Sequence, residues 1–405
     1  MQSRLFNRRE RGGKVFVSPD YNRSMEQQRE MTWKRIEYLL ERGVFKGWMA
    51  GEGEDVEMKM FACSEVLGIF DHSISIKLGV HFVLWGGAIQ FAGTQQHHDK
   101  WLRDTENFKI KGWFSTTELG HGSNVRGIET VTTYDSKTGE FVNNTPCEST
   151  QNYWIVGAAK HATHTILLSQ LVINGTNEGV HALIAQIRDG DGNVLRNIRI
   201  ADCGHKNCLN GVDNGRIWFD NVRVPRENLL SSVADVSPDG EYLSSIKDPD
   251  QRFSAFLTPM TAGRVNVAVN AVYQSKVGLT IAISANQVNF KDFLMLQLCY
   301  DLWSQLLENA ACEEDTPIKQ DHSRLLLHGV TCKILQECRE DCGGQGLKTE
   351  NRVGHLKAEH DVQSTFEGNN YILMQQTSWS RGVFIFRSKI REAPDIFRLV
   401  LYNSP

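Results

Sequence analysis

The sequence predicts an α+β fold in three successive parts: an N-terminal helical domain, a central antiparallel β domain and a C-terminal helical bundle. Three observations predict it. Apolar residues first recur at helical spacing, short β-branched and aromatic runs separated by turn residues follow, and helical spacing then returns. We therefore place the domains at residues 1–112, 113–240 and 250–380, followed by a divergent tail at residues 381–405.

The N-terminal domain is predicted to begin with an amphipathic helix over residues 24–45, SMEQQREMTWKRIEYLLERGVF. This run starts with a serine, which is a good helix N-cap, and carries apolar residues at helical spacing. The same spacing continues over residues 55–70 and over residues 71–90, where Asp71 and Ser73 are placed to cap the helix.

The central domain is predicted from six short runs: ETVTTY, EFVNN, YWIV, TILLSQLVI, VHALIAQI and RIWFDNVRV. Gly, Asn, Asp and Pro turn signals separate them, which predicts an antiparallel all-β domain from about Phe114 to Val236. Beyond Arg252 apolar residues again follow successive helical turns. The order helix, sheet, helix fits a fold in which a ligand lies between layers.

Composition excludes several classes of protein. The chain of 405 residues is 40% hydrophobic and 23% charged, so it can bury a sizeable core. Its net charge of -4 and its scattered Lys and Arg residues give no basic surface for nucleic acid. Nine cysteines without a C-x-x-C pair indicate reduced thiols in a reducing compartment. No run approaches about 18 apolar residues, so we expect no membrane span.

Two glycine-containing segments have a backbone that could approach a ligand closely. In FSTTELGHGSNVRG, Phe114–Gly127, the glycines leave the backbone bare enough to approach a flat ligand, and Thr117 adds a hydroxyl. A glycine-rich hairpin loop explains this pattern equally well. In ECREDCGGQG, Glu337–Gly346, a helix ends at Gly343 and Gly344. Because one glycine would suffice to end a helix, the pair indicates close approach to a ligand.

A third segment, GHKNCLNGVDNGRIWFDNVRVPRENLL, is rich in polar groups that could bind a ligand. These are Asn210, Asp213, Asn214 and Arg216. The favoured interpretation is structural, because such groups can satisfy one another in a buried turn.

The fourth segment, STFEGNN, contains an acidic residue, Glu367, between Phe366 and Gly368. A carboxylate beside an apolar wall has its charged form disfavoured, so its pKa rises toward the range of a general base. Taken alone, a glutamate of this kind is more often a solvated surface acid.

Together and in this order, TTELGHGSN, CLNGVDNGRIWFDNV, CGGQG and TFEG closely resemble the acyl-CoA oxidase family. The likeness is nearest to plant peroxisomal enzymes that act on medium-chain acyl-CoA, which share CGHK and SSIKDPDQRF. It covers nearly all of residues 5–282 and again about 334–376. The resemblance implies an acyl-CoA dehydrogenase/oxidase-like fold, with flavin adenine dinucleotide (FAD) between the β domain and the helical bundle, and a homodimer.

The resemblance also implies an activity in peroxisomal fatty acid β-oxidation, although the chain shows no targeting signal. Fatty acyl-CoA would lose a proton from C2 and a hydride from C3 to give trans-2-enoyl-CoA, and molecular oxygen would be reduced to hydrogen peroxide. Glu367 would be the catalytic base, and no metal is implied. The cofactor-binding residues would be Thr117, Gly120, Trp154, Ile155, Val156, Gly157, Gly343, Gly344 and Gln345, and the substrate-binding residues would be Ser123 and Arg264.

The chain also departs from the family pattern. After Ile283 an Arg-rich helix is replaced by SANQVNFKDFLMLQLCYDLWSQLLENAACEEDTP, and the residues beyond Gln376 do not continue the bundle, which we expect to be incomplete. A leader before LFNRRERGGK is expected to be missing. Val156 and Asn369 stand where relatives tend to have glycine and aspartate.

Alternatives to an active oxidase remain open. One is a catalytically impaired, truncated isoform. Another is an acyl-CoA dehydrogenase, which shares the fold and the glutamate but passes electrons to a carrier flavoprotein. A metal module built from Cys203, His205 and Cys208 with later cysteines and histidines fits no standard zinc spacing and is not expected.

Overall fold

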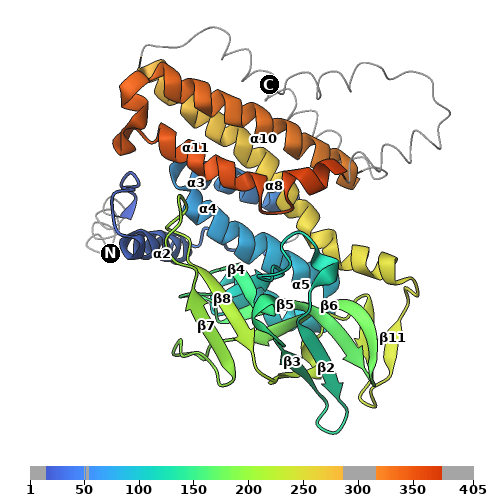
Figure 1. Ribbon diagram of the computed structural model, residues 1–405. Helices are drawn as coiled ribbons and strands as arrows, with labels where there is room; N and C mark the ends of the chain where they lie inside the picture. The colour runs from blue at the N-terminus through green and yellow to red at the C-terminus, as the bar shows by residue number, and fades with distance from the viewer. Residues whose placement is uncertain (1–14, 50, 52–53, 286–315, 376–405) are drawn as a thin grey trace, which may run out of the picture.

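The computed structural model describes residues 15–49, 51, 54–285 and 316–375. The start of the chain, the altered stretch at residues 286–315 and the divergent tail at residues 381–405 lie outside the described residues. In Figure 1 a group of helices lies above a β domain, and the two are joined by one long helix, α8 (Pro249–Ser284). The predicted order of helix, sheet, helix is confirmed.

The N-terminal helices begin as their caps predict. The helix α2 (Met25–Glu41) has Ser24 as its N-cap, and Ser24 and Gln27 form a reciprocal capping box. Asp71 caps α4 by accepting a hydrogen bond from the backbone N–H of Ser73. The remaining elements of this part are α3 (Glu54–Phe70), α4 (His72–Leu78), η1 (Gly79–Gly86), α5 (Gly87–Ala92), α6 (Gln95–His97), η2 (His98–Leu102) and α7 (Arg103–Glu106).

One helical run, His72–Ala92, is long and apolar enough to cross a membrane by length and composition alone. The expectation that no such stretch exists was therefore wrong. In this fold 61% of the apolar window is buried, and Ile74, Phe82 and Trp85 lie inside the core formed with the sheet. The run is apolar because it packs on both the β domain and the C-terminal helices, which is typical of a central core helix.

Eleven strands in the described residues form the β domain. They are β1 (Gly112–Ser115), β2 (Val131–Asp135), β3 (Glu140–Asn144), β4 (Asn152–Val156), β5 (His164–Ile173), β6 (Thr176–Gln186), β7 (Ile198–Asp202), β8 (Asn214–Phe219), β9 (Val222–Pro225), β10 (Ala234–Val236) and β11 (Tyr242–Ser244). The largest sheet has the order β1-β5-β2-β3-β9, with β6 also paired to β5, and β4-β8-β7 forms a second sheet.

The prediction of a wholly antiparallel domain was wrong at β5. Both β1 and β2 pair with β5 in parallel, whereas the other pairs are antiparallel. Parallel neighbours need a long crossover, and the chain from β1 to β5 supplies one because it contains the intervening strands. Turn residues report only the local reversals, so they could not reveal this pairing.

Strand β5 is buried on both faces and joins two cores. Ile166 and Leu168 pack with the N-terminal helices, while Leu167 and Leu171 pack in the core between the two sheets. This division follows from the two-residue period of a strand.

The C-terminal helices form the third core. Helix α8 begins at Pro249 after an Asp248 cap and packs along α10 (Thr316–Asp341), and α11 (Val353–Asp361) lies across both. Short 3-10 turns, η6 (Gly343–Leu347), η7 (Thr349–Asn351) and η8 (Val362–Ser364), connect α10 to α11 and lead toward Glu367.

Candidate active site

Glu367 lies just beyond η8, in a backbone conformation that glutamate rarely adopts. Its φ is 57°, in the left-handed region. Although the residue as a whole is partly exposed, its Oε2 is buried and has no hydrogen-bond partner among the described residues. The carboxyl group faces Gly263 of α8, where a Cβ atom would lie only 2.7 Å from Cδ of Glu367. A side chain at position 263 would therefore displace the carboxyl group.

Burial raises the pKa of Glu367 to about 7, and the positive charges of Arg324 and Arg264 partly oppose this rise. The direction agrees with the sequence prediction for this carboxyl group. A carboxyl group with such a pKa exchanges a proton near neutral pH, as a general base must. Arg264, predicted to contact substrate, is thus close enough to Glu367 to act on its charge.

Arg324 is a site residue that sequence reasoning missed. It lies on α10, is 0% exposed and donates hydrogen bonds to the backbone carbonyls of Gln363, Phe366 and Glu367. It lies between the two stretches on which the sequence resemblance was based, residues 5–282 and about 334–376, so no motif pointed to it. A buried arginine in a helix otherwise looks like any surface arginine in sequence.

The glycine-rich segment after β1 is held by a buried acid, Glu118, which sequence reasoning also did not single out. Its carboxylate accepts hydrogen bonds from the backbone N–H groups of Glu129 and Thr130, and from the Thr130 hydroxyl. His121 Nδ1 lies 3.0 Å from Glu118 Oε2. Glu118 therefore fixes this loop from inside, and the loop is more than a hairpin turn.

Two predicted cofactor-binding segments lie side by side, because the Thr117 carbonyl accepts a hydrogen bond of 2.8 Å from the N–H of Tyr153. The side-chain hydroxyl of Thr117 forms no hydrogen bond with the described residues, and the neighbouring Thr116 hydroxyl is buried without a partner there. Gly120 and Ser123 are exposed on the same loop. These groups leave donors and acceptors open at one edge of the β domain.

The residues of β4 divide between surface and core. Trp154 is 50% exposed and has a φ of 65° beside an irregularity in the strand pairing, which is unusual for so large a side chain. Ile155 is 3% exposed, and its side chain packs in the core between the sheets, so its place beside the cofactor stays a prediction. Alternation along a strand sends the two side chains to opposite faces. Val156 is half-buried against the same core.

Gly157 also has an internal role. Its φ is 76°, and a Cβ atom there would lie 2.3 Å from the ring of the buried Trp113. The space that a side chain at position 157 would fill is occupied by the tryptophan ring, and not left open for a ligand. In sequence the two reasons for a glycine look the same.

The glycine pair after α10 lies apart from Glu367. Gly343 ends the helix with a φ of 55°, whereas Gly344 is exposed and its Cβ position has nothing within 4 Å. Gln345 is exposed and accepts a hydrogen bond from Asn351 through its carbonyl. Arg324 and Gly343 are separated by most of α10, roughly 25 Å at about 1.5 Å per residue. The two sets of predicted residues are therefore not brought together directly.

Asp213 and Asn214 of the third motif are hydrogen-bonded mainly to residues outside the motif, and not to one another as the structural interpretation expected. Asp213 is buried with Lys77, which pairs with it, and with His161, whose Nδ1 lies 3.3 Å from Asp213 Oδ1. Burial would raise the pKa of Asp213, but the charge of Lys77 and the contact with His161 hold it well below its ordinary value. Asn214 donates to the carbonyl of Trp154, which ties this motif to β4.

Three residues that could ligate a metal gather on α10 and α11: His328, Cys332 and His360, with ligand atoms within 4.8 Å of one another. This group differs from the cysteines weighed in the sequence. Both ring nitrogens of His360 are already engaged, Nδ1 with Gln274 and Nε2 with the carbonyl of His328. The arrangement is explained by hydrogen bonding within the bundle.

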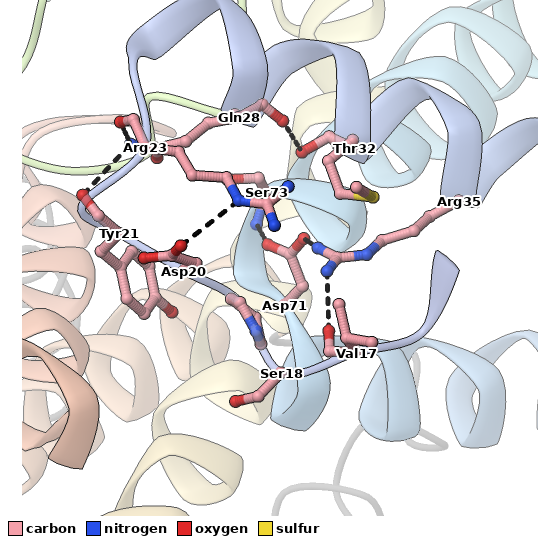
Figure 2. Close-up of a pocket in the computed structure, with 13 residues that line it drawn as sticks. Val17, Ser18, Asp20, Tyr21, Arg23, Gln28, Thr32, Arg35, Asp71 and Ser73 are labelled. Atoms are coloured by element: carbon pink, nitrogen blue, oxygen red, sulfur yellow. Dashed lines mark hydrogen bonds and ion pairs between the residues drawn. The ribbon is translucent and has the colours of Figure 1, made fainter. Parts of the chain in front are cut away.

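A small pocket that is open to solvent lies between α2, the start of α4 and the segment before α2 (Figure 2). Arg35 and Asp71 form an ion pair on its wall, and Arg23 pairs with Asp20 at its rim. The predicted site residues do not line it. Its charged groups are paired internally, so it is separate from the candidate active site.

Comparison with known proteins places this architecture in a class. The crystal structure of acyl-CoA oxidase 1 from Yarrowia lipolytica superposes with a TM-score of 0.79 at 25% identity, covering 96% of this chain and 63% of that one. Acyl-CoA oxidase 3 from the same organism gives a TM-score of 0.78 at 26% identity, covering 98% and 63%. The chain therefore has the acyl-CoA dehydrogenase/oxidase fold.

The sequence comparisons narrow the class to one family. Residues 14–111 match the family described as acyl-coenzyme A oxidase N-terminal, and residues 323–380 match the acyl-CoA oxidase C-alpha1 domain. The chain is 60% identical to the peroxisomal acyl-coenzyme A oxidase 3 of Arabidopsis thaliana over 93% of its length, and 31% identical to the human peroxisomal acyl-coenzyme A oxidase 3 over 89%. The chain belongs to the acyl-CoA oxidase family. It spans 60% of the Arabidopsis protein and 57% of the human one.

Proposed function

We propose that this chain is an FAD-dependent acyl-CoA oxidase that converts fatty acyl-CoA to trans-2-enoyl-CoA and reduces oxygen to hydrogen peroxide in peroxisomal β-oxidation. The observation that carries the proposal is the buried carboxyl group of Glu367, set against Gly263 with a pKa of about 7. The Arabidopsis and human relatives, which are peroxisomal acyl-coenzyme A oxidases, support it.

In this function Glu367 removes the C2 proton of the thioester. A carboxylate oxygen of ionised Glu367 forms a bond to that proton, and the electron pair of the broken C2–H bond forms the C2=C3 double bond as the hydride leaves C3. Bound FAD would accept this hydride and deliver two electrons to oxygen. Burial keeps water from the carboxylate, and Arg264 and Arg324 stabilise its ionised form.

The FAD would be held by the open groups at the edge of the β domain. The hydroxyls of Thr116 and Thr117, which have no hydrogen-bond partner among the described residues, and the exposed ring of Trp154 are suited to a flat, polar-edged ligand. Gly120 and Ser123 lie on the same loop, where Ser123 would contact the CoA portion. An acyl-CoA oxidase 2 of Caenorhabditis elegans was solved bound to FAD, ascaroside-CoA and ATP, and it shares this fold at 21% identity.

The exposed Gly343, Gly344 and Gln345 would contact the cofactor of a second copy of the chain. Their position beyond the end of α10, far from Glu367, supports this assignment. A homodimer would then be needed for full cofactor contacts.

The test is direct. The purified full chain, supplied with FAD, should become yellow and release hydrogen peroxide when fatty acyl-CoA is added, and Glu367→Gln should abolish turnover while retaining colour. Glu340→Gln, which changes an exposed acid of α10, is the matched control and should leave turnover unchanged.

Each alternative predicts a different result. Acyl-CoA that bleaches the flavin without peroxide, with turnover restored by an artificial electron acceptor, would favour the dehydrogenase. A folded chain that takes up no flavin would favour the catalytically impaired form. Turnover that survives Glu367→Gln would remove the proposed base.

A further inference from the structure

The loop that carries Glu367 is tied to α10 by one buried side chain. Arg324 Nη2 donates to the carbonyls of Gln363 at 2.8 Å and Phe366 at 2.6 Å, and Nη1 donates to the carbonyl of Glu367. These carbonyls belong to η8, which contains Gln363, and to the turn that follows it, where the last carbonyls have no N–H partners within the helical turn. One guanidinium group thus donates to three backbone carbonyl oxygens between residues 363 and 367.

This hold matters because the backbone at Glu367 is strained. A φ of 57° is disfavoured for glutamate and persists only where the surroundings enforce it. Two of the charge-assisted bonds of Arg324 act on the peptide groups on either side of Glu367, whose orientation sets this backbone conformation. The direction of the Glu367 side chain follows from that backbone.

Two contacts between uncharged side chains also fix the segment around Glu367. Asn370 Nδ2 lies 3.3 Å from Nδ1 of His328, one helical turn beyond Arg324, and Gln363 Nε2 lies 3.1 Å from Nε2 of His72 on α4. Burial lowers the pKa of both His328 and His72, so these rings are neutral near pH 7. The cations that act on Glu367 are Arg324 from α10 and Arg264 from α8.

We propose that Arg324 is a positioning residue that fixes the turn at residues 363–367 so that the carboxyl group of Glu367 faces Gly263. The proposal rests on the proposed role of Glu367 as a base. Arg324 touches neither substrate nor cofactor in this scheme and works through the backbone. Its charge adds a second effect, because a cation nearby favours the ionised carboxylate.

The two effects separate in two variants of the full chain. Arg324→Gln removes the charge and most of the hydrogen bonds, whereas Arg324→Lys keeps the charge but cannot reach three carbonyls at once. We expect Arg324→Gln to lower kcat by about 100-fold with less than about a threefold change in KM, because a misplaced base costs about that much. The acid limb of its pH–rate profile should move to higher pH. Arg324→Lys should lower kcat about tenfold with the acid limb nearly unmoved.

Arg196→Gln, which changes an exposed arginine of the β domain, is the control and should match the wild-type chain in every measurement. A folded Arg324→Gln with wild-type kcat and an unmoved acid limb would overturn the proposal. Should Arg324→Gln not fold, Arg324→Lys decides, because a folded lysine variant with wild-type kcat would overturn it equally.

A second readout needs no turnover. Infrared difference spectra between the wild-type chain and Glu367→Gln isolate the protonated carboxyl band of Glu367, and its titration can be followed without substrate. We expect the midpoint to rise in Arg324→Gln, and a midpoint that stays in place would count against the proposal. If the wild-type chain showed no turnover while the midpoint of the Glu367 band still rose in Arg324→Gln, that result would contradict the proposed function but would support the positioning role of Arg324.

Discussion

The carboxyl group of Glu367 fills the space that a side chain at Gly263 would need. A Cβ atom at position 263 would lie 2.7 Å from both Cδ and Oε2 of Glu367, and 3.0 Å from Oε1. Helix α8 and the loop after α11 can approach this closely only because residue 263 is glycine. The orientation of the candidate base therefore depends on a residue more than a hundred positions earlier in the chain.

Gly263→Ala should push the carboxyl group of Glu367 aside and lower kcat by about tenfold to 100-fold, since a shift of about 1 Å has this effect on a reacting group. Steady-state kinetics with a fatty acyl-CoA measures it. Gly329→Ala is the matched control: Gly329 is exposed on α10 and has nothing within 4 Å of its Cβ position. That change should slightly stabilise the helix and leave kcat alone. Equal kcat values for both variants would contradict the assigned contact.

The pH dependence of turnover should report the raised pKa of Glu367. Only the ionised carboxylate accepts a proton, so kcat/KM should fall about tenfold per pH unit below about pH 7 and level off above it. A pH series with a non-sticky acyl-CoA measures this limb. A limb near 4.5, the ordinary value of a glutamate, would show that the carboxyl group is solvated in the working enzyme.

Glu359 should make the chain less stable as pH rises. It is 1% exposed, and burial together with the charge of Asp71 raises its pKa from 4.5 to about 8, against the opposing charge of Arg352. Because the folded state holds the proton more tightly, its contribution to stability is complete below pH 4.5 and is lost as pH rises to about 8. Glu359→Gln should therefore raise the melting temperature at pH 8, with a gain in the free energy of unfolding of at most about 5 kcal/mol, and change little at pH 4.5.

Thermal unfolding at the two pH values checks this, with the exposed Glu350→Gln as the control. If the melting temperature of Glu359→Gln depended on pH as that of the wild-type chain does, the pKa of Glu359 would not be raised by burial.

Asp213→Ala should destabilise the chain by about 3–5 kcal/mol. The change leaves the ammonium group of Lys77, which is 1% exposed, buried without its carboxylate. Denaturant unfolding measures the loss, and restoring a neutral pair with Lys77→Met in the same chain should recover part of it. Arg126→Ala, which breaks an exposed pair with Asp250, should cost less than about 1 kcal/mol. If Asp213→Ala and Arg126→Ala lowered the free energy of unfolding by similar amounts, the burial of the Lys77–Asp213 ion pair would be contradicted.

The sequence by itself determined the features that depend on neighbouring residues. Ser24 and Asp71 begin helices because a cap needs only the next three residues, and the strand at 164–173 is recognised from its own apolar run. Glu367 was identified because its motif is contiguous. The separation of Trp154 from Ile155 by exposure also follows from strand alternation, although the prediction did not apply it.

Only the tertiary structure decided which distant segments meet. The parallel pairing of β5 with β1 and β2, the Glu118 anchor of the glycine-rich loop, and the positions of Gly263 and Arg324 around Glu367 all join residues far apart in the chain. Periodicity and turn chemistry act over a few residues, whereas these contacts are selected by packing the three cores together. For that reason the sequence could name Glu367 as the candidate base, but only the fold showed which distant residues orient its carboxyl group.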